Sequence, residues 1–109
     1  MQEYFIKTVG APDVSFCGEL LATASSENIA SKMRGKKNNS RWTVLELYKT
    51  EAGAFVCVNI GRSSKPGEVD QAKVEVVETE KAVIDFFGQG WLSKELYETA
   101  GIENVIRIK

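Results

Sequence analysis

The chain contains no histidine among its 109 residues. This absence excludes Ser-His-Asp and Cys-His catalysis, histidine-ligated metal sites, and the side chain that most often transfers protons near neutral pH. Catalysis by carboxylates or lysine is the class that remains.

Cysteine is also scarce, with Cys17 and Cys57 far apart in the chain. Two isolated cysteines make no zinc framework and a poor disulfide scaffold. Because each falls within a strand-like pattern, we expect both to be small buried apolar residues. A reactive thiol is the alternative, and it requires a neighbouring base that the sequence does not show.

Long apolar runs are missing, and the first residues show no basic segment followed by an apolar one. We therefore expect a cytoplasmic protein that is neither secreted nor inserted in a membrane. A hydrophobic fraction of 43% and a charged fraction of 27% are typical of one globular domain. We predict that residues 1–109 form a single domain.

Charge is unevenly distributed along the chain, although the net charge is only −1. Residues 1–29 carry one Lys or Arg against four Asp or Glu, residues 30–66 carry eight against two, and residues 67–109 carry five against nine. A basic central third between acidic flanks bears on binding partners rather than on the fold.

Alternating apolar residues predict a β-hairpin from Arg41 to Gly61, with Gly53 in its turn. Both faces of this hairpin carry apolar side chains, so we expect it to be central and covered by helix on at least one face. Similar patterns predict strands at 3–9, 14–23 and 72–77, and an edge strand at 104–108. A long polar loop is expected at 25–40, with a helical turn near 29–33.

Thr79 is placed to cap a helix at 80–87, and a second helix is expected at 92–100. Strands followed by helices indicate an α+β fold rather than alternating βαβ units. We predict an antiparallel sheet of four to six strands with two short C-terminal helices packed on one face.

The candidate partner-binding residues are cations around the ends of the hairpin. They are Lys32, Arg34, Lys36, Lys37, Arg41, Arg62 and Lys65. Both loops that carry them are expected at the same end of the hairpin, where clustered cations suit phosphate groups or an acidic protein surface. A solvated loop without function is the alternative.

Aromatic residues give two further hypotheses. Trp91, beside the corner 88–90 between the two predicted helices, is a candidate contact residue, with packing beneath that corner as the alternative. Trp42, Tyr48 and Phe55 form either a base-stacking surface or part of the core, and we expect the core.

The acidic residues of the C-terminal third fall mostly on the solvent face of the predicted helices. We therefore predict no catalytic residues, no metal site and no cofactor.

The segments 41–62, 86–88 and 91–97, read as RWTVLELYKTEAGAFVCVNIGR, FFG and WLSKELY, resemble a recurrent pattern in small accessory proteins of bacterial plasmids, integrative elements and phages. The resemblance covers about residues 14–101. It implies a non-enzymatic protein that binds a host machine, and anti-CRISPR and other anti-defence inhibitors are prominent in this class.

Two functions follow as predictions. The first is a stoichiometric inhibitor of a bacterial defence complex, anti-CRISPR-like, that belongs to a mobile element. The second is a small nucleic-acid-binding module that uses the basic loop 32–41. We also expect a homodimer through an edge strand, at 3–9 or 105–108. We expect no membrane partner.

Overall fold

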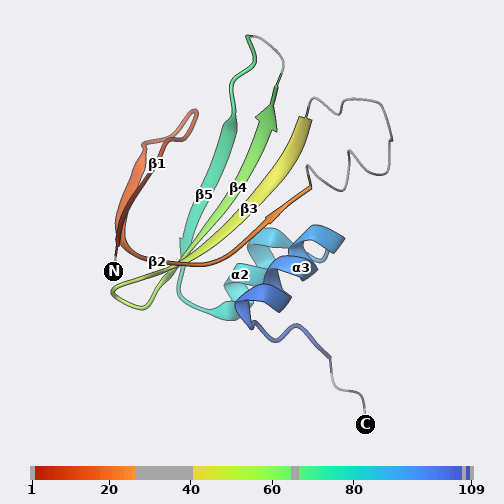
Figure 1. Cartoon of the computed structure of the whole chain (residues 1–109). Helices are drawn as coiled ribbons and strands as arrows, with labels where there is room; N and C mark the ends of the chain where they lie inside the picture. Colours follow the sequence, from red (N-terminus) through yellow and green to blue (C-terminus); the bar gives the residue numbers. More distant parts are fainter. Residues whose placement is uncertain (1, 27–40, 65–66, 107, 109) are drawn as a thin grey trace.

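The computed structural model describes residues 2–26, 41–64, 67–106 and 108. Five strands precede two helices: β1 (Gln2–Ile6), β2 (Val14–Ser25), β3 (Arg41–Thr50), β4 (Phe55–Ser63), β5 (Gln71–Val77), α2 (Glu80–Phe87) and α3 (Trp91–Ala100). The strands form one antiparallel sheet in chain order, β1-β2-β3-β4-β5 (Figure 1). The predicted α+β class is confirmed.

The β3–β4 hairpin lies at the centre of this sheet, as predicted. Its register extends from Arg41 opposite Ser63 to Lys49 opposite Phe55. In its turn, Gly53 has a φ of 93° and donates its backbone N–H to the carbonyl of Thr50 at 2.9 Å. Glycine fits this position because other residues rarely adopt such a φ.

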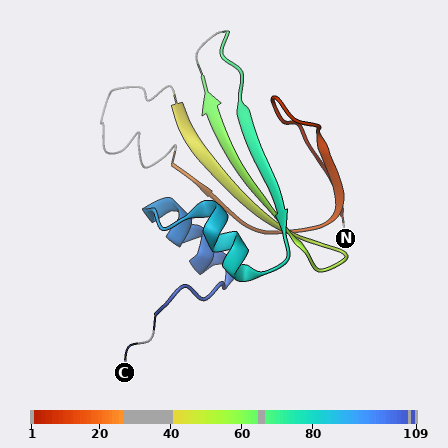
Figure 2. The same cartoon turned by 180° about the vertical axis from the view of Figure 1, so that it is seen from behind.

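Helices α2 and α3 cover one face of the sheet (Figures 1 and 2). Val83, Leu96 and Tyr97 of the helices are buried in one cluster with Leu47 and Cys57 of the hairpin. The Tyr97 hydroxyl donates to the carbonyl of Gly88 at 2.7 Å, which ties α3 to the end of α2. The predicted packing of both helices on one face is therefore confirmed.

The opposite face of the sheet is concave and holds a second apolar cluster. Tyr4 of β1 lies two strands away from β3, yet its ring centroid is 4.6 Å from that of Tyr48. Phe16 completes this aromatic group, at 5.4 Å from Tyr4 and 5.2 Å from Tyr48. Such contacts require that the sheet curls strongly and brings β1 over the face that the helices leave open.

The curl coincides with an irregularity in β2. The register with β3 shifts between Leu20 and Ala22, so Leu21 is an extra residue. Phe16 before the shift packs in the concave cluster, whereas Ala22 after it packs against the helices. The expectation that alternate residues from 14 to 22 share one face is therefore wrong, because the extra residue reverses the faces.

The predicted edge strand at 104–108 is also wrong, since the described residues of that segment belong to no strand. Asn104 instead exchanges side-chain hydrogen bonds with Gln89 at 3.0 and 2.8 Å. This pair holds the start of the tail at the corner between the helices, away from the sheet.

Three smaller expectations also change or go untested. The first strand ends at Ile6 rather than at residue 9. Cys17 is exposed, because Phe16 and not its neighbour points into the concave face, whereas Cys57 is buried as predicted. The helical turn predicted near 29–33 lies outside the described residues.

In the part of the chain that the structure describes, no helix is long and apolar enough to span a membrane.

Candidate functional site at the open end of the hairpin

The ends of β3 and β4 that lie farthest from their turn form what we name the open end. Arg41 lies opposite Ser63 there, and Trp42 lies opposite Arg62. A hollow of about 780 Å³ is present at this end. Its lining residues are Ser26, Arg41, Trp42, Thr43, Gly61, Arg62, Ser63, Glu68, Val69 and Gln71.

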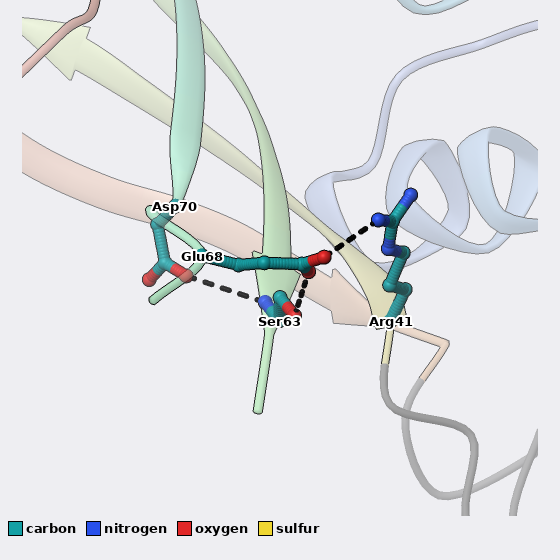
Figure 3. A network of polar contacts seen from close by, with 4 residues as sticks. All are labelled: Arg41, Ser63, Glu68 and Asp70. Carbon is teal, nitrogen blue, oxygen red and sulfur yellow. Dashed lines mark hydrogen bonds and ion pairs between the residues drawn. The ribbon is translucent and has the colours of Figure 1, made fainter. Parts of the chain in front are cut away.

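A polar network connects the strands across this hollow (Figure 3). The carboxylate of Glu68 accepts a hydrogen bond from Arg41 Nη2 at 2.7 Å and another from the Ser63 hydroxyl. Asp70 accepts from the backbone N–H of Ser63 at 3.3 Å and from Arg62 Nη1 at 2.9 Å. The segment between β4 and β5 is thereby attached to the beginning of β3.

Each described arginine of the candidate site therefore has a carboxylate partner. Hydrogen bonding to Glu68, and next the charge of Glu68, raise the pKa of the Arg41 guanidinium above its usual value. Both ion pairs are largely exposed, so they contribute little to the stability of the fold. Among the described residues of this end, two arginines therefore alternate with two carboxylates.

Ser26 links the end of β2 to the same place. Its backbone N–H donates to the carbonyl of Thr43 at 3.0 Å, and its hydroxyl oxygen accepts from the N–H of Thr43 at 2.9 Å. Ser26 and Arg41 both line the hollow. In the sequence they flank residues 27–40. The predicted contact residues Lys32, Arg34, Lys36, Lys37 and Lys65 themselves lie outside the described residues.

Trp91 lies beside a second hollow, of about 340 Å³, between the beginning of α3 and the sheet. Ser26 and Thr43 line both hollows, so the two adjoin. Trp91 is the first residue of α3 and is 55% exposed, while Leu92 and Ser93 behind it are buried. The tryptophan therefore lies mainly on the surface and not beneath the corner.

Glu68 and Asp70 are not among the binding residues expected from the sequence. The β4–β5 register places Gly61 opposite Gln71. Continued by one residue, this register puts Asp70 opposite Arg62. An acidic residue that falls opposite an arginine in a predicted strand pair is thus the sequence feature that predicts this ion pair.

The structure gives less support to the alternative sites, which are an aromatic stacking surface, a reactive thiol and a metal site. Tyr48 and Phe55 are only 6% and 7% exposed and belong to the clusters on opposite faces of the sheet, so they form no shared stacking surface. Burial, followed by the charge of Glu75, raises the pKa of the Cys57 thiol to about 12. Among the described residues, no three metal-ligating side chains lie close together.

The hollow at the open end thus has two paired arginines and a half-buried Trp42 in its lining. The hollow that adjoins it has exposed Trp91 in its lining. No family model, curated protein or solved structure matches the chain. The physical properties of this surface therefore carry the functional proposal.

Proposed function

We propose that the chain is a non-enzymatic binding protein that contacts a protein partner through the open end of the β3–β4 hairpin. The supporting observation is the pairing of Arg41 with Glu68 at a hollow that adjoins the hollow lined by exposed Trp91. Arginine and tryptophan are enriched among the residues that dominate the energy of protein interfaces. Arginines whose positions are fixed by ion pairs lose less conformational freedom when a partner binds.

A protein partner fits this surface better than nucleic acid does. Binding to a phosphate backbone relies on cations that replace the counterions of the nucleic acid. Here the carboxylates of Glu68 and Asp70 lie at hydrogen-bond distance from the arginines, and they would repel phosphates. Alternating charges instead match the complementary charge patterns of protein interfaces. The nucleic-acid alternative rests on the loop cations at 32–37, outside the described residues.

The finer proposal follows from the resemblance to accessory proteins of mobile elements. We place the protein in the bacterial cytoplasm, where it binds a defence complex and inhibits it by occupying a functional surface. Such an inhibitor acts stoichiometrically: the activity of the target falls in proportion to added protein and reaches its minimum near a fixed molar ratio.

Affinity capture from a nuclease-treated bacterial lysate tests the proposal. We expect the wild-type chain to retain a specific protein and Trp91→Ala to bind it about thirtyfold more weakly, because removal of such an anchor costs about 2 kcal/mol. Phe5→Ala is the matched control, since Phe5 is an exposed aromatic residue on β1 that does not line either hollow of the site.

Two results would contradict the proposed function. Capture that occurs from an untreated lysate and is lost from the nuclease-treated one would indicate nucleic acid as the partner. Equal retention of the protein by Trp91→Ala and wild type would remove the open end as the contact surface. For a captured complex, titration of its activity with the wild-type chain then distinguishes an inhibitor from a passive binder.

A further inference from the structure

β5 is an edge strand of the sheet, and all of its residues are described. It pairs with β4 on one side, and no described strand pairs with its outer side. An edge of this kind presents unpaired backbone N–H and C=O groups that readily accept another strand.

The outer side of this edge borders a hollow. A hollow of about 750 Å³ is lined by Ala72–Glu75 of β5, by the β1–β2 connection, and by Asp85 and Phe86 of α2. β1 and β5 are the two edges of the sheet and do not pair with each other (Figures 1 and 2). The middle of β5 therefore borders this hollow and no further described strand.

The two faces of β5 differ in chemistry. Lys73 and Glu75 lie opposite Asn59 and Cys57 of β4, so they are on the face that carries the helices. Ala72, Val74 and Val76 lie opposite the concave-face residues of β4. Val76 is 56% exposed, because nothing beyond the edge covers it.

Directly opposite residues of two antiparallel strands lie on the same face of a sheet. If two β5 strands pair about a two-fold axis, one residue of β5 must therefore lie opposite its own copy at the axis. An axis at Lys73 places two lysines opposite each other, and an axis at Glu75 does the same with two glutamates. An axis at Val74 places Lys73 opposite Glu75 of the second copy, twice. It also places Ala72 opposite Val76 and pairs Val74 with itself.

We infer that the β5 strands of two copies pair antiparallel about Val74 and join the two sheets into one. The occupant of the edge is a second copy of this chain, and the reason is the charge complementarity of β5 with itself. This pairing covers Val76 with apolar neighbours and gives a closed two-fold assembly with no further free β5 edge. It uses neither Trp91 nor the paired arginines, so it is independent of the proposed function.

Charge exchange at two positions tests this pairing by sedimentation velocity over a range of concentrations. Lys73→Glu places glutamates opposite Glu75, and Glu75→Lys places lysines opposite Lys73. We expect each variant to raise the dimer dissociation constant about tenfold or more, because two attractive pairs become repulsive. The double variant with both changes restores opposite charges and should dimerise like the wild type.

A mixture of the two single variants adds a stricter test. In the mixed pair, every lysine of one chain faces a glutamate of the other, so we expect a heterodimer from two chains that are each monomeric. Lys94→Glu and Glu98→Lys on the exposed face of α3 are the controls, because they make the same charge changes away from β5. These two variants should leave the wild-type dimer unchanged.

A wild-type chain that stays monomeric at the highest soluble concentration would overturn the inference. So would a dimer that the single changes in β5 leave intact, or one that the double change fails to restore. Thermal unfolding of each variant shows whether a loss of dimer reflects a loss of fold.

Discussion

At the scale of single residues, Gly18 has the most restrictive surroundings among the described glycines. A Cβ atom at this position would lie 2.2 Å from the backbone carbonyl oxygen of Lys49. Gly18 pairs with Gln2 of β1 on one side and with Thr50 of β3 on the other. It therefore lies where β2 leaves one partner for the other, and the absent side chain permits the close approach that the curl requires.

Replacement of this glycine should be costly. We expect Gly18→Ala to lower the free energy of unfolding by about 2 kcal/mol or more, because the backbone of β3 must move to admit the methyl group. Gly61→Ala is the matched control in β4, where the added Cβ atom meets nothing closer than the carbonyl oxygen of Gln71 at 3.9 Å. Urea unfolding followed by circular dichroism measures both, and equal stability of the two variants would contradict this account.

At the scale of elements, α2 is held at its beginning by a side-chain cap. The Thr79 hydroxyl oxygen accepts a hydrogen bond from the backbone N–H of Ala82 at 3.1 Å, and Glu80 lies in the first turn. Both features stabilise a helix N-terminus, by filling an unsatisfied donor and by complementing the helix dipole.

Removal of the Thr79 hydroxyl should weaken the packing of α2 on the sheet. We expect Thr79→Ala to lower the free energy of unfolding by about 1 kcal/mol, whereas Thr79→Ser, which keeps the oxygen, should stay close to wild type. Chemical denaturation of the three proteins under identical conditions measures the difference. If Thr79→Ser lost as much stability as Thr79→Ala, the hydrogen bond would not be the cause.

The elements that local sequence predicts are those whose signals lie within them. Alternation around Gly53 predicts the hairpin, and Thr79 together with the apolar stripe predicts α2, because turn and cap preferences act over a few residues. The curl of the sheet depends instead on Gly18 meeting Lys49 and on one extra residue at Leu21, which are contacts between distant segments. The alternating pattern of the tail likewise predicts a strand, because it does not show that Asn104 forms hydrogen bonds with the distant Gln89.

The candidate site also has a part that the sequence predicts and a part that it does not. Sequence patterns place Arg41 and Arg62 at one end of the hairpin, and the structure shows them there. Their carboxylate partners, Glu68 and Asp70, lie between β4 and β5, so the charge balance around these arginines depends on where folding places that segment. Sequence position alone therefore shows two cations, Arg41 and Arg62, where folding forms two ion pairs.

At the scale of the whole molecule, the two proposed surfaces are compatible. In the antiparallel β5 pair, the beginning of one β5 lies beside the end of the other. The two open ends, each next to the beginning of its own β5, therefore lie at opposite ends of the joined sheet. The proposed dimer would thus present two separate copies of the proposed binding surface and would hold two copies of a partner.

Buried acidic groups in both cores link the stability of the molecule to alkaline pH. Burial is the largest cause in each case and raises the pKa of Cys57 and of Tyr97 to about 12. It also raises the pKa of Tyr48 well above its usual value. In the unfolded chain these groups titrate near their reference values of about 8.5 for cysteine and about 10 for tyrosine.

The folded chain therefore holds protons that the unfolded chain releases as the pH rises. Stability from these groups is complete below their unfolded pKa values and declines above them, so the urea midpoint should fall from about pH 8.5 upward. Cys57→Ala and Tyr97→Phe each remove one such group, and the midpoint should then fall less steeply between pH 8 and 11. A wild-type midpoint that stays constant over this range would show that burial does not hold these protons.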